Sequence, residues 1–276
     1  MLLAINVGNT NVHYGLFDGE RLTEHFRVAT DHAQTADEYG VTLRHLLRRA
    51  GTALPSATPS GGGALSGGPG DPVHAAVLAS VVPPVTATLV EAIRVYLGVE
   101  PLVVRHGVRT GLDIRYETPV SLGADRLVDA VAAVALHGAP VITLDFGTAT
   151  VLNVIAAERA FLGGAILPGV RTAADALSRS AARLTRIDLH VPPSVIGRTT
   201  QQSIQSGAIY GYVGMIEGLL GRLRSTLPAD QRHAPVVATG GMVSLIAPLT
   251  SAIDFVVPSL ALIGLRLIWE MNPQRC

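Results

Sequence analysis

Cysteine is nearly absent from this 276-residue sequence, which contains only Cys276. A single cysteine excludes both a disulfide framework and a cysteine-based metal site within one chain. Neither sign of charge is in excess, because lysine plus arginine and aspartate plus glutamate each number 21, and no basic run stands out. A nucleic-acid partner or an anionic membrane surface is therefore not expected.

Long apolar segments are also missing. The stretch MLLAINVGNTN turns polar after five apolar residues, unlike a signal peptide, and no run approaches the length that spans a bilayer. By elimination, we expect a cytoplasmic location and no membrane partner. The sequence has neither a Walker A motif nor a strand-linked G-x-G-x-x-G, which disfavours P-loop and Rossmann folds. Its nine histidines show no metal-ligand spacing.

What the sequence does contain is a large apolar fraction, 48% of residues, with only 15% charged. At this length, a sizeable core fits one large domain or two of ordinary size. Thr35 and Glu38 form a capping box for the first helix, and residues 51–72, rich in glycine, proline, serine and alanine, predict a flexible loop. The elements predicted for the first half are strands over 2–7, 12–17 and 22–28, a helix to about residue 50, a strand over 75–80, a helix over 84–97, a strand over 102–104 and a helix over 119–137.

The same order restarts at residue 141. The second half is predicted to contain strands over 141–145, 151–156 and 160–166, helices over 170–184 and 202–224, a strand over 236–239, a short helix, a strand over 253–256 and a helix over 260–271. The repeat predicts an α/β protein with a duplicated ribonuclease-H-like fold, the actin-like ATPase fold. We expect domains at 1–138 and 139–276 with a nucleotide cleft between them. The alternative is two unrelated α/β domains with similar openings.

Both halves open with a strand and a polar turn, Gly8-Asn9-Thr10-Asn11 in the first and Gly147-Thr148-Ala149-Thr150 in the second. Such turns offer closely spaced N–H groups and hydroxyls, and their glycines allow close backbone approach, so they suit phosphate oxygens. One such turn is weak evidence, because Gly-Asn turns connect many hairpins. Two of them at equivalent places predict that a polyphosphate is gripped from both halves.

At these residues the chain resembles the type III pantothenate kinases, within the superfamily of acetate and sugar kinases, actin and heat-shock chaperones. The resemblance covers nearly the whole chain. The motifs that carry it are Val7-Gly8-Asn9-Thr10-Asn11, Tyr116 with Pro119, Gly123-Ala124-Asp125-Arg126, Asp145-Phe146-Gly147-Thr148-Ala149-Thr150, Gly163-Gly164-Ala165-Ile166-Leu167-Pro168-Gly169, Ile196-Gly197-Arg198-Thr199-Thr200, Gln205-Ser206-Gly207 and Ala238-Thr239-Gly240-Gly241.

The resemblance implies ATP-dependent phosphorylation of pantothenate to 4'-phosphopantothenate, the first step of coenzyme A biosynthesis. Asp125 is the implied catalytic base, and phosphoryl transfer to an alcohol needs such a group to accept or orient the hydroxyl proton. Its place in the first turns of a predicted helix suggests that the helix's positive end keeps the carboxylate ionised. The implied substrate-binding residues are Tyr116, Gly123, Ala124, Asp125, Arg126 and Thr200.

Each of these assignments has a simpler alternative in the sequence. Arg126 suits a pantothenate carboxylate as a planar fork, or equally an i,i+3 ion pair with Asp129. Tyr116 and Thr200, taken alone, read as ordinary loop residues.

The cofactors implied by the resemblance are ATP with Mg²⁺ and a monovalent cation, K⁺ or NH4⁺. Asp145 matches the ligand of the monovalent cation, with a strand-terminal cap as the alternative reading. The implied nucleotide-binding residues are Asn6, Val7, Gly8, Asn9, Thr10, Asn11, Val12, His13, Thr148, Gly240 and Gly241. The resemblance also implies a homodimer, with Thr200 completing the pocket of the partner subunit.

Position 6 departs from the family, which carries aspartate there, whereas this chain has Asn6. Asparagine keeps an oxygen ligand but loses the charge that attracts a hard dication. A catalytically impaired relative that binds nucleotide or pantothenate as a sensor or assembly protein is therefore the alternative function, and a sugar or acetate kinase is a third.

Five glycines repeat along the predicted helix over 202–224, at positions 207, 211, 214, 218 and 221. Their spacing puts them on one helix face, and each costs about 1 kcal/mol of helix propensity relative to alanine. Close packing against another helix would compensate for that cost. The sequence leaves open whether this partner helix is internal or belongs to a second subunit.

Overall fold

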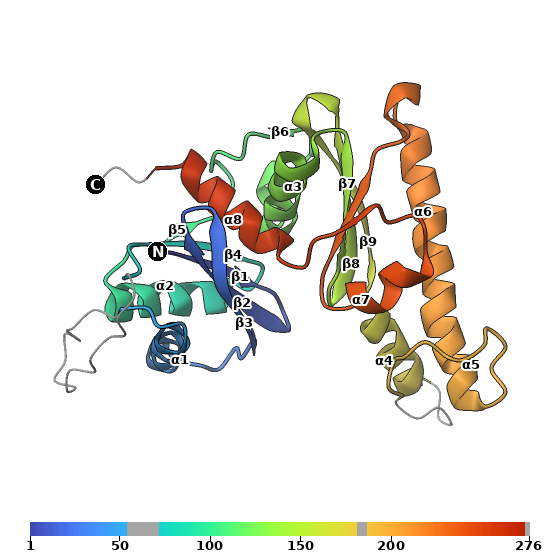
Figure 1. Cartoon of the computed structure of the whole chain (residues 1–276), viewed down its shortest axis with the longest axis horizontal. Coiled ribbons are helices and arrows are strands. Elements are labelled where there is room, and N and C mark those ends of the chain that lie inside the picture. Colours follow the sequence, from blue (N-terminus) through green and yellow to red (C-terminus); the bar gives the residue numbers. More distant parts are fainter. Residues whose placement is uncertain (54–71, 181–186, 274–276) are drawn as a thin grey trace. The chain divides into compact units, whose positions relative to one another are not determined.

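The computed structural model describes residues 1–53, 72–180 and 187–273 (Figure 1). Its contacts divide the chain into two compact units. Unit 1 comprises Met1–Thr110, Val120–Val131 and Ala261–Cys276, and unit 2 comprises Gly111–Pro119 and Ala132–Leu260. The division into domains at residues 1–138 and 139–276 stays a prediction. The predicted flexible loop 51–72 lies, from residue 54 to 71, outside the described residues.

Unit 1 contains a five-stranded sheet in the order β3-β2-β1-β4-β5. Strand β1 pairs antiparallel with β2 and parallel with β4, so the chain enters the middle of the sheet. The central strands β1 and β4 are buried along almost their whole length, because both faces of the sheet are covered, whereas the edge strand β3 is largely exposed. The strands are β1 (Leu2–Val7), β2 (Asn11–Asp18), β3 (Arg21–Ala29), β4 (Ala75–Ser80) and β5 (Leu102–Val103).

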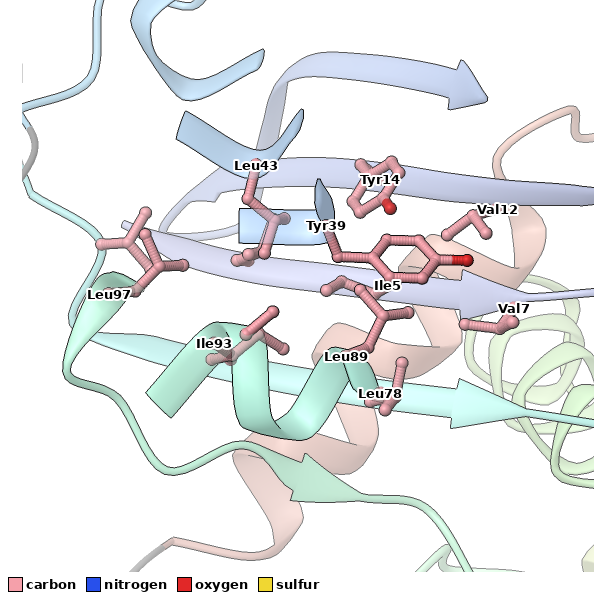
Figure 2. Close-up of a cluster of buried hydrophobic side chains, with 14 of the residues drawn as sticks. Ile5, Val7, Val12, Tyr14, Tyr39, Leu43, Leu78, Leu89, Ile93 and Leu97 are labelled. Carbon is pink, nitrogen blue, oxygen red and sulfur yellow. The ribbon is translucent and has the colours of Figure 1, made fainter. Parts of the chain in front are cut away.

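Two helices, α1 (Ala36–Arg49) and α2 (Pro83–Leu97), supply the side chains that pack on one face of this sheet. The predicted capping box is confirmed, since Thr35 and Glu38 bond each other's backbone amides at the start of α1. Figure 2 shows the resulting core, in which Ile5 and Tyr14 of the strands lie among helix side chains such as Leu89.

The opposite face of the unit 1 sheet contacts helix α8 (Leu260–Met271), whose Leu262 packs on Gly15 of β2.

Helix α3 (Ala124–His137) starts five residues later than predicted. Residues Pro119–Ser121 form a separate 3₁₀ turn instead. Gly123, a poor helix former, becomes the cap residue whose carbonyl accepts from the Leu127 amide at 3.3 Å.

Unit 2 contains a six-stranded sheet in the order β11-β10-β7-β8-β9-β6. The order β9-β8-β7-β10-β11 repeats the order β3-β2-β1-β4-β5 of unit 1. The directions also agree, because β7 pairs antiparallel with β8 and parallel with β10, as β1 does with β2 and β4. This repetition confirms the duplicated ribonuclease-H-like fold. The strands are β6 (Asp113–Ile114), β7 (Val141–Phe146), β8 (Ala149–Ala156), β9 (Ala160–Pro168), β10 (Val236–Thr239) and β11 (Phe255–Val256).

The helices of unit 2 are α4 (Val170–Ser180), α5 (Thr200–Ser206), α6 (Tyr212–Thr226) and the short α7 (Val243–Ile246). A π-helical turn, Gly207–Gly211, joins α5 to α6, so the predicted helix over 202–224 is continuous but locally widened. The predicted close packing of its glycines has no internal partner among the described residues. A Cβ atom added at Gly207, Gly211, Gly214 or Gly221 would meet nothing within 4 Å. None of the helices formed by the described residues is long and apolar enough to cross a membrane.

Candidate active site

The first polar turn, between β1 and β2, is held in place by a residue from the end of β3. The Thr30 hydroxyl donates to the Gly8 carbonyl at 2.7 Å, and the Thr30 amide donates to the Thr10 carbonyl at 2.9 Å. Within the turn, the Gly8 amide donates to the Asn11 carbonyl at 3.0 Å. Asn9 and Thr10 at the tip are exposed. The turn therefore has a fixed backbone and an accessible tip, as a phosphate-binding turn requires.

Asn6 and His13 lie directly opposite each other in the β1–β2 ladder, so their side chains share a face of the sheet. Asn6 Oδ1 is buried and has no hydrogen-bond partner among the described residues. Burial lowers the pKa of His13 to about 4, with a further contribution from the positive charge of Arg27, so this imidazole is neutral at pH 7. By contrast, the side chains of Val7 and Val12 are fully buried in the core, which leaves only their backbone for a ligand.

Asp125 is the second residue of α3, and its Oδ1 accepts a hydrogen bond from the Arg126 amide at 2.8 Å. The carboxylate folds back over Gly123, where an added Cβ would lie 2.4 Å from Asp125 Oδ1. Burial raises the pKa of Asp125, outweighing the opposing effects of the Arg126 amide and the Arg126 charge. The sequence predicted that the positive helix terminus keeps this carboxylate ionised. In the structure, the cost of desolvating the charge is larger and favours the protonated form. A raised pKa makes a carboxylate a better general base.

The neighbours of Asp125 on α3 are packed into the protein. Ala124 and Arg126 are buried, and so is Asp129 one turn further along. A guanidinium in this position is not a solvated surface charge, and a buried charge calls for a partner. Both readings of Arg126, a substrate contact or an ion pair with Asp129, are compatible with its burial.

In unit 2, the second polar turn is held in an analogous way, from the start of α4. The Thr148 carbonyl accepts from the Gly169 amide at 2.9 Å and from the Thr172 hydroxyl at 2.7 Å. A Cβ atom on Gly169 would lie 2.3 Å from the Gly147 carbonyl oxygen, so only glycine allows this approach. By ladder register, this turn is one residue shorter than the first, with Phe146 opposite Thr150.

Asp145 lies beside both glycine-containing turns of unit 2. A Cβ atom added at Gly240 would lie 2.4 Å from Asp145 Oδ1, and one at Gly147 would lie 3.5 Å from its Oδ2. Gly240 has φ +97°, a backbone conformation that favours glycine. The structure thus brings Asp145, the turn at Thr148 and the Gly240–Gly241 turn together at the ends of β7 and β10.

The remaining predicted residues lie on other parts of unit 2. Tyr116 packs over Gly163 of β9, which has φ +115°, and meets Phe161 edge-on with ring centroids 6.4 Å apart. Thr200 is exposed at the first position of α5, where the preceding Thr199 caps the helix. Sequence reasoning missed the anchors Thr30 and Thr172. Their only sequence signal is a threonine shortly after a strand or early in a helix.

The fold defines the class of this protein. A putative 2-dehydro-3-deoxygalactonokinase from Sinorhizobium meliloti aligns with 100% of this chain and 98% of its own at 12% identity and TM-score 0.58. An archaeal actin homologue aligns with 98% of this chain and 99% of its own at 14% identity and TM-score 0.51. At such identities the likeness shows the fold alone, which is that of the actin-like ATPases and kinases.

The sequence relationships are closer. The family model described as type III pantothenate kinase matches residues 2–222. The type III pantothenate kinase of Moorella thermoacetica is 45% identical over 272 residues, covering 99% of this chain and 100% of the relative. That of Roseiflexus sp. is 45% identical over 274 residues, covering 99% of each. The chain belongs to the type III pantothenate kinase family and is a phosphotransferase.

Proposed function

We propose that this protein transfers the γ-phosphoryl group of ATP to the primary hydroxyl of pantothenate, giving 4'-phosphopantothenate for coenzyme A synthesis. The observation that carries the proposal is Asp125, a carboxylate of raised pKa at the start of α3, in a chain related over its full length to pantothenate kinases. This full-length relationship favours the enzyme over the alternative of a non-catalytic binding protein. The expected cytoplasmic location stays a prediction.

The nucleotide would be held chiefly by backbone groups. In this proposal the turns at Gly8–Asn11 and Gly147–Thr148 contact phosphate oxygens, since both have fixed backbones and glycines that allow close approach. The Gly240–Gly241 turn, whose two glycines carry no side chains, would lie against adenosine. Such preorganised donors account for most of the catalysis of phosphoryl transfer.

The donor set of unit 1 fits a divalent metal carried by ATP. Asn6 Oδ1 is a buried oxygen with no hydrogen-bond partner among the described residues, and Mg²⁺ takes oxygen ligands, commonly through water. Asn6 would hold the metal or its water, and the metal would supply charge neutralisation on the phosphates. For the monovalent cation, we propose the Asp145 carboxylate, which lies against the backbone of Gly147 and Gly240 beside the second polar turn.

On the acceptor side, Asp125 would take the hydroxyl proton of pantothenate as the new P–O bond forms and the bond from the γ-phosphorus to the β–γ bridging oxygen breaks, with ADP as the leaving group. Arg126 would bind the pantothenate carboxylate through its planar fork, with Gly123 and Ala124 lining the pocket. Tyr116 and Thr200 are proposed as further substrate contacts. The substitution Asp125→Asn removes the proton acceptor but keeps the side-chain shape, which makes it the matched inactive control.

We also propose that the protein is a homodimer. The glycine face of the long helix, at Gly207, Gly211, Gly214 and Gly221, has no neighbour within 4 Å of an added Cβ atom among the described residues. Glycines that cost helix propensity without internal packing are best compensated by a second copy of the same face. Sedimentation equilibrium tests this, and a monomer at micromolar concentration would oppose it.

The function is tested by incubating the purified chain with MgATP, potassium and, in separate reactions, pantothenate, acetate or glucose. ADP release and mass spectrometry of the product are followed together. Turnover with pantothenate alone, abolished in Asp125→Asn, is the expected result. Turnover with acetate or glucose but not pantothenate would move the protein to another kinase class, and calorimetric binding of pantothenate without turnover would favour the binding-protein alternative.

A further inference from the structure

Helix α8 contacts two elements of unit 1 through two glycine positions, one on each side. On one side, a Cβ atom added at Gly15 of β2 would lie 2.9 Å from Leu262 Cδ1. On the other side, a Cβ atom added at Gly264 would lie 1.9 Å from the Val128 carbonyl oxygen and 2.6 Å from its carbon. Helix α8 therefore packs the Leu262 side chain against β2, whereas its backbone at Gly264 lies directly against the backbone of α3.

The contact at Gly264 cannot be relaxed by rotating a side chain. The atoms opposite are the Val128 main chain, and real Cβ atoms essentially never come closer than 3.0 Å to other atoms. An alanine there would force the two helices apart by about 1 Å. Leu265, the next residue of α8, is fully buried, so the helix is tightly enclosed at this point.

Val128 lies three residues after Asp125, on the same side of α3. The first turn of α3 also rests on the chain that leaves β4. A Cβ atom at Gly123 would lie 3.7 Å from Val81 Cγ1, and the Val81 amide donates to the Val7 carbonyl at 3.1 Å. Val7 immediately precedes the first polar turn. The depth at which α3 packs thus determines how the Asp125 carboxylate lies relative to that turn.

We propose that Gly264 is a positioning residue for catalysis, acting by allowing α8 to pack in backbone contact with α3 and so holding Asp125 at its working position. The inference rests on the proposed function, because it assigns Asp125 the role of base. Displacing a catalytic group by about 1 Å costs on the order of 100-fold in rate. Binding of ATP is less sensitive, because Gly264 touches neither polar turn in the contacts described above.

The test is Gly264→Ala in the full chain. The expected result is a kcat reduced about 100-fold, with KM for ATP within about threefold of the parent. KM for pantothenate should rise as well, because Arg126 moves with the first turn of α3. Leu43→Ala is the matched stability control, since Leu43 is buried in the core on the opposite face of the same sheet. This control should lower the melting temperature but keep kcat within about threefold when assayed below its transition.

A double variant keeps the proposal testable if Gly264→Ala alone folds poorly. Leu262→Ala empties the space between α8 and Gly15, so α8 gains room to retreat from α3. Gly264→Ala/Leu262→Ala should therefore recover at least tenfold of the lost kcat. A Gly264→Ala variant with kcat within threefold of the parent, an equal loss in Leu43→Ala, or no recovery in the double variant would overturn the proposal.

A second readout does not depend on activity. The Arg126 amide, which donates to Asp125 Oδ1, reports directly on the first turn of α3. Gly264→Ala should speed hydrogen exchange at the Arg126 amide at least tenfold. Leu43→Ala should speed exchange at the amides of α1 but leave exchange at the Arg126 amide as slow as in the parent. If the parent lacks pantothenate kinase activity but the exchange effect is found, the proposed function fails and the packing role of Gly264 stands. Unchanged exchange overturns the packing role.

Discussion

Restoring a carboxylate at position 6 perturbs the site with very little change in shape. Asn6→Asp replaces the amide nitrogen with oxygen, so the packing at the end of β1 is retained. The existing Oδ1 is buried and has no hydrogen-bond partner among the described residues, and the residue opposite is His13. The substitution therefore introduces charge, and hardly any volume, beside the first polar turn.

The effect on stability follows from the surroundings of this side chain. His13 is neutral at pH 7, because its pKa is lowered to about 4, so it offers no opposing charge to the new carboxylate. A buried, poorly paired polar group costs about 1 to 3 kcal/mol. We expect the metal-free variant to melt a few degrees below the parent, and millimolar Mg²⁺ with ATP to reverse that loss.

The effect on catalysis has the opposite sign. Removing one preorganised electrostatic group typically costs roughly 100- to 1,000-fold in kcat, so adding one where the metal is proposed should raise kcat by up to that amount. A coupled assay across a Mg²⁺ series, together with thermal melts with and without MgATP, measures both effects. A variant whose kcat, Mg²⁺ dependence and melting temperature all equal those of the parent would refute the placement of Asn6 at the metal.

Four further predictions concern three positions. Because burial raises the pKa of Asp125, kcat/KM for pantothenate should fall on acidification at a pH higher than the ordinary aspartate pKa, which is near 3.9. A pH–rate profile measures this fall. The raised pKa also means that ionised Asp125 costs native stability at neutral pH, so Asp125→Asn should melt at a higher temperature than the parent at pH 7 but not at pH 3, as calorimetry can check. Gly123→Ala should lower kcat at least 100-fold, since its Cβ would overlap Asp125 Oδ1, and near-parent turnover would exclude that crowding. Replacing potassium with sodium at matched ionic strength should reduce turnover if Asp145 holds a monovalent cation, and equal rates would count against it.

Much of the fold could be predicted from local pattern. Strands β1, β4 and β10 and helix α8 have the predicted bounds, because continuous apolar runs and flanking turn residues define them. The start of α3 was predicted too early, since Pro119 looks like a helix start but Gly123 interrupts the hydrogen-bonding pattern. Strand β6 was missed entirely. It is two residues long and exists because it pairs with β9, a contact that local sequence does not encode.

The candidate site divides in the same way. Its turns could be predicted, because glycine and threonine after a strand have local meaning. The direction of the Asp125 pKa could not, because desolvation depends on elements remote in sequence. Nor could the anchors Thr30 and Thr172, which each reach a turn about twenty residues away. Gly264 looks like an unremarkable glycine in a helix until its distance to Val128 is known.

The most direct test of the account is a single-turnover experiment with γ-labelled ATP and excess pantothenate. The parent and Asp125→Asn are mixed with the two substrates, quenched at intervals and analysed for labelled 4'-phosphopantothenate. We expect label to pass to pantothenate in the parent, and at least 100-fold more slowly in Asp125→Asn while ATP still binds. Label that stays on ATP or goes only to water in the parent, or equal transfer by both proteins, would contradict it.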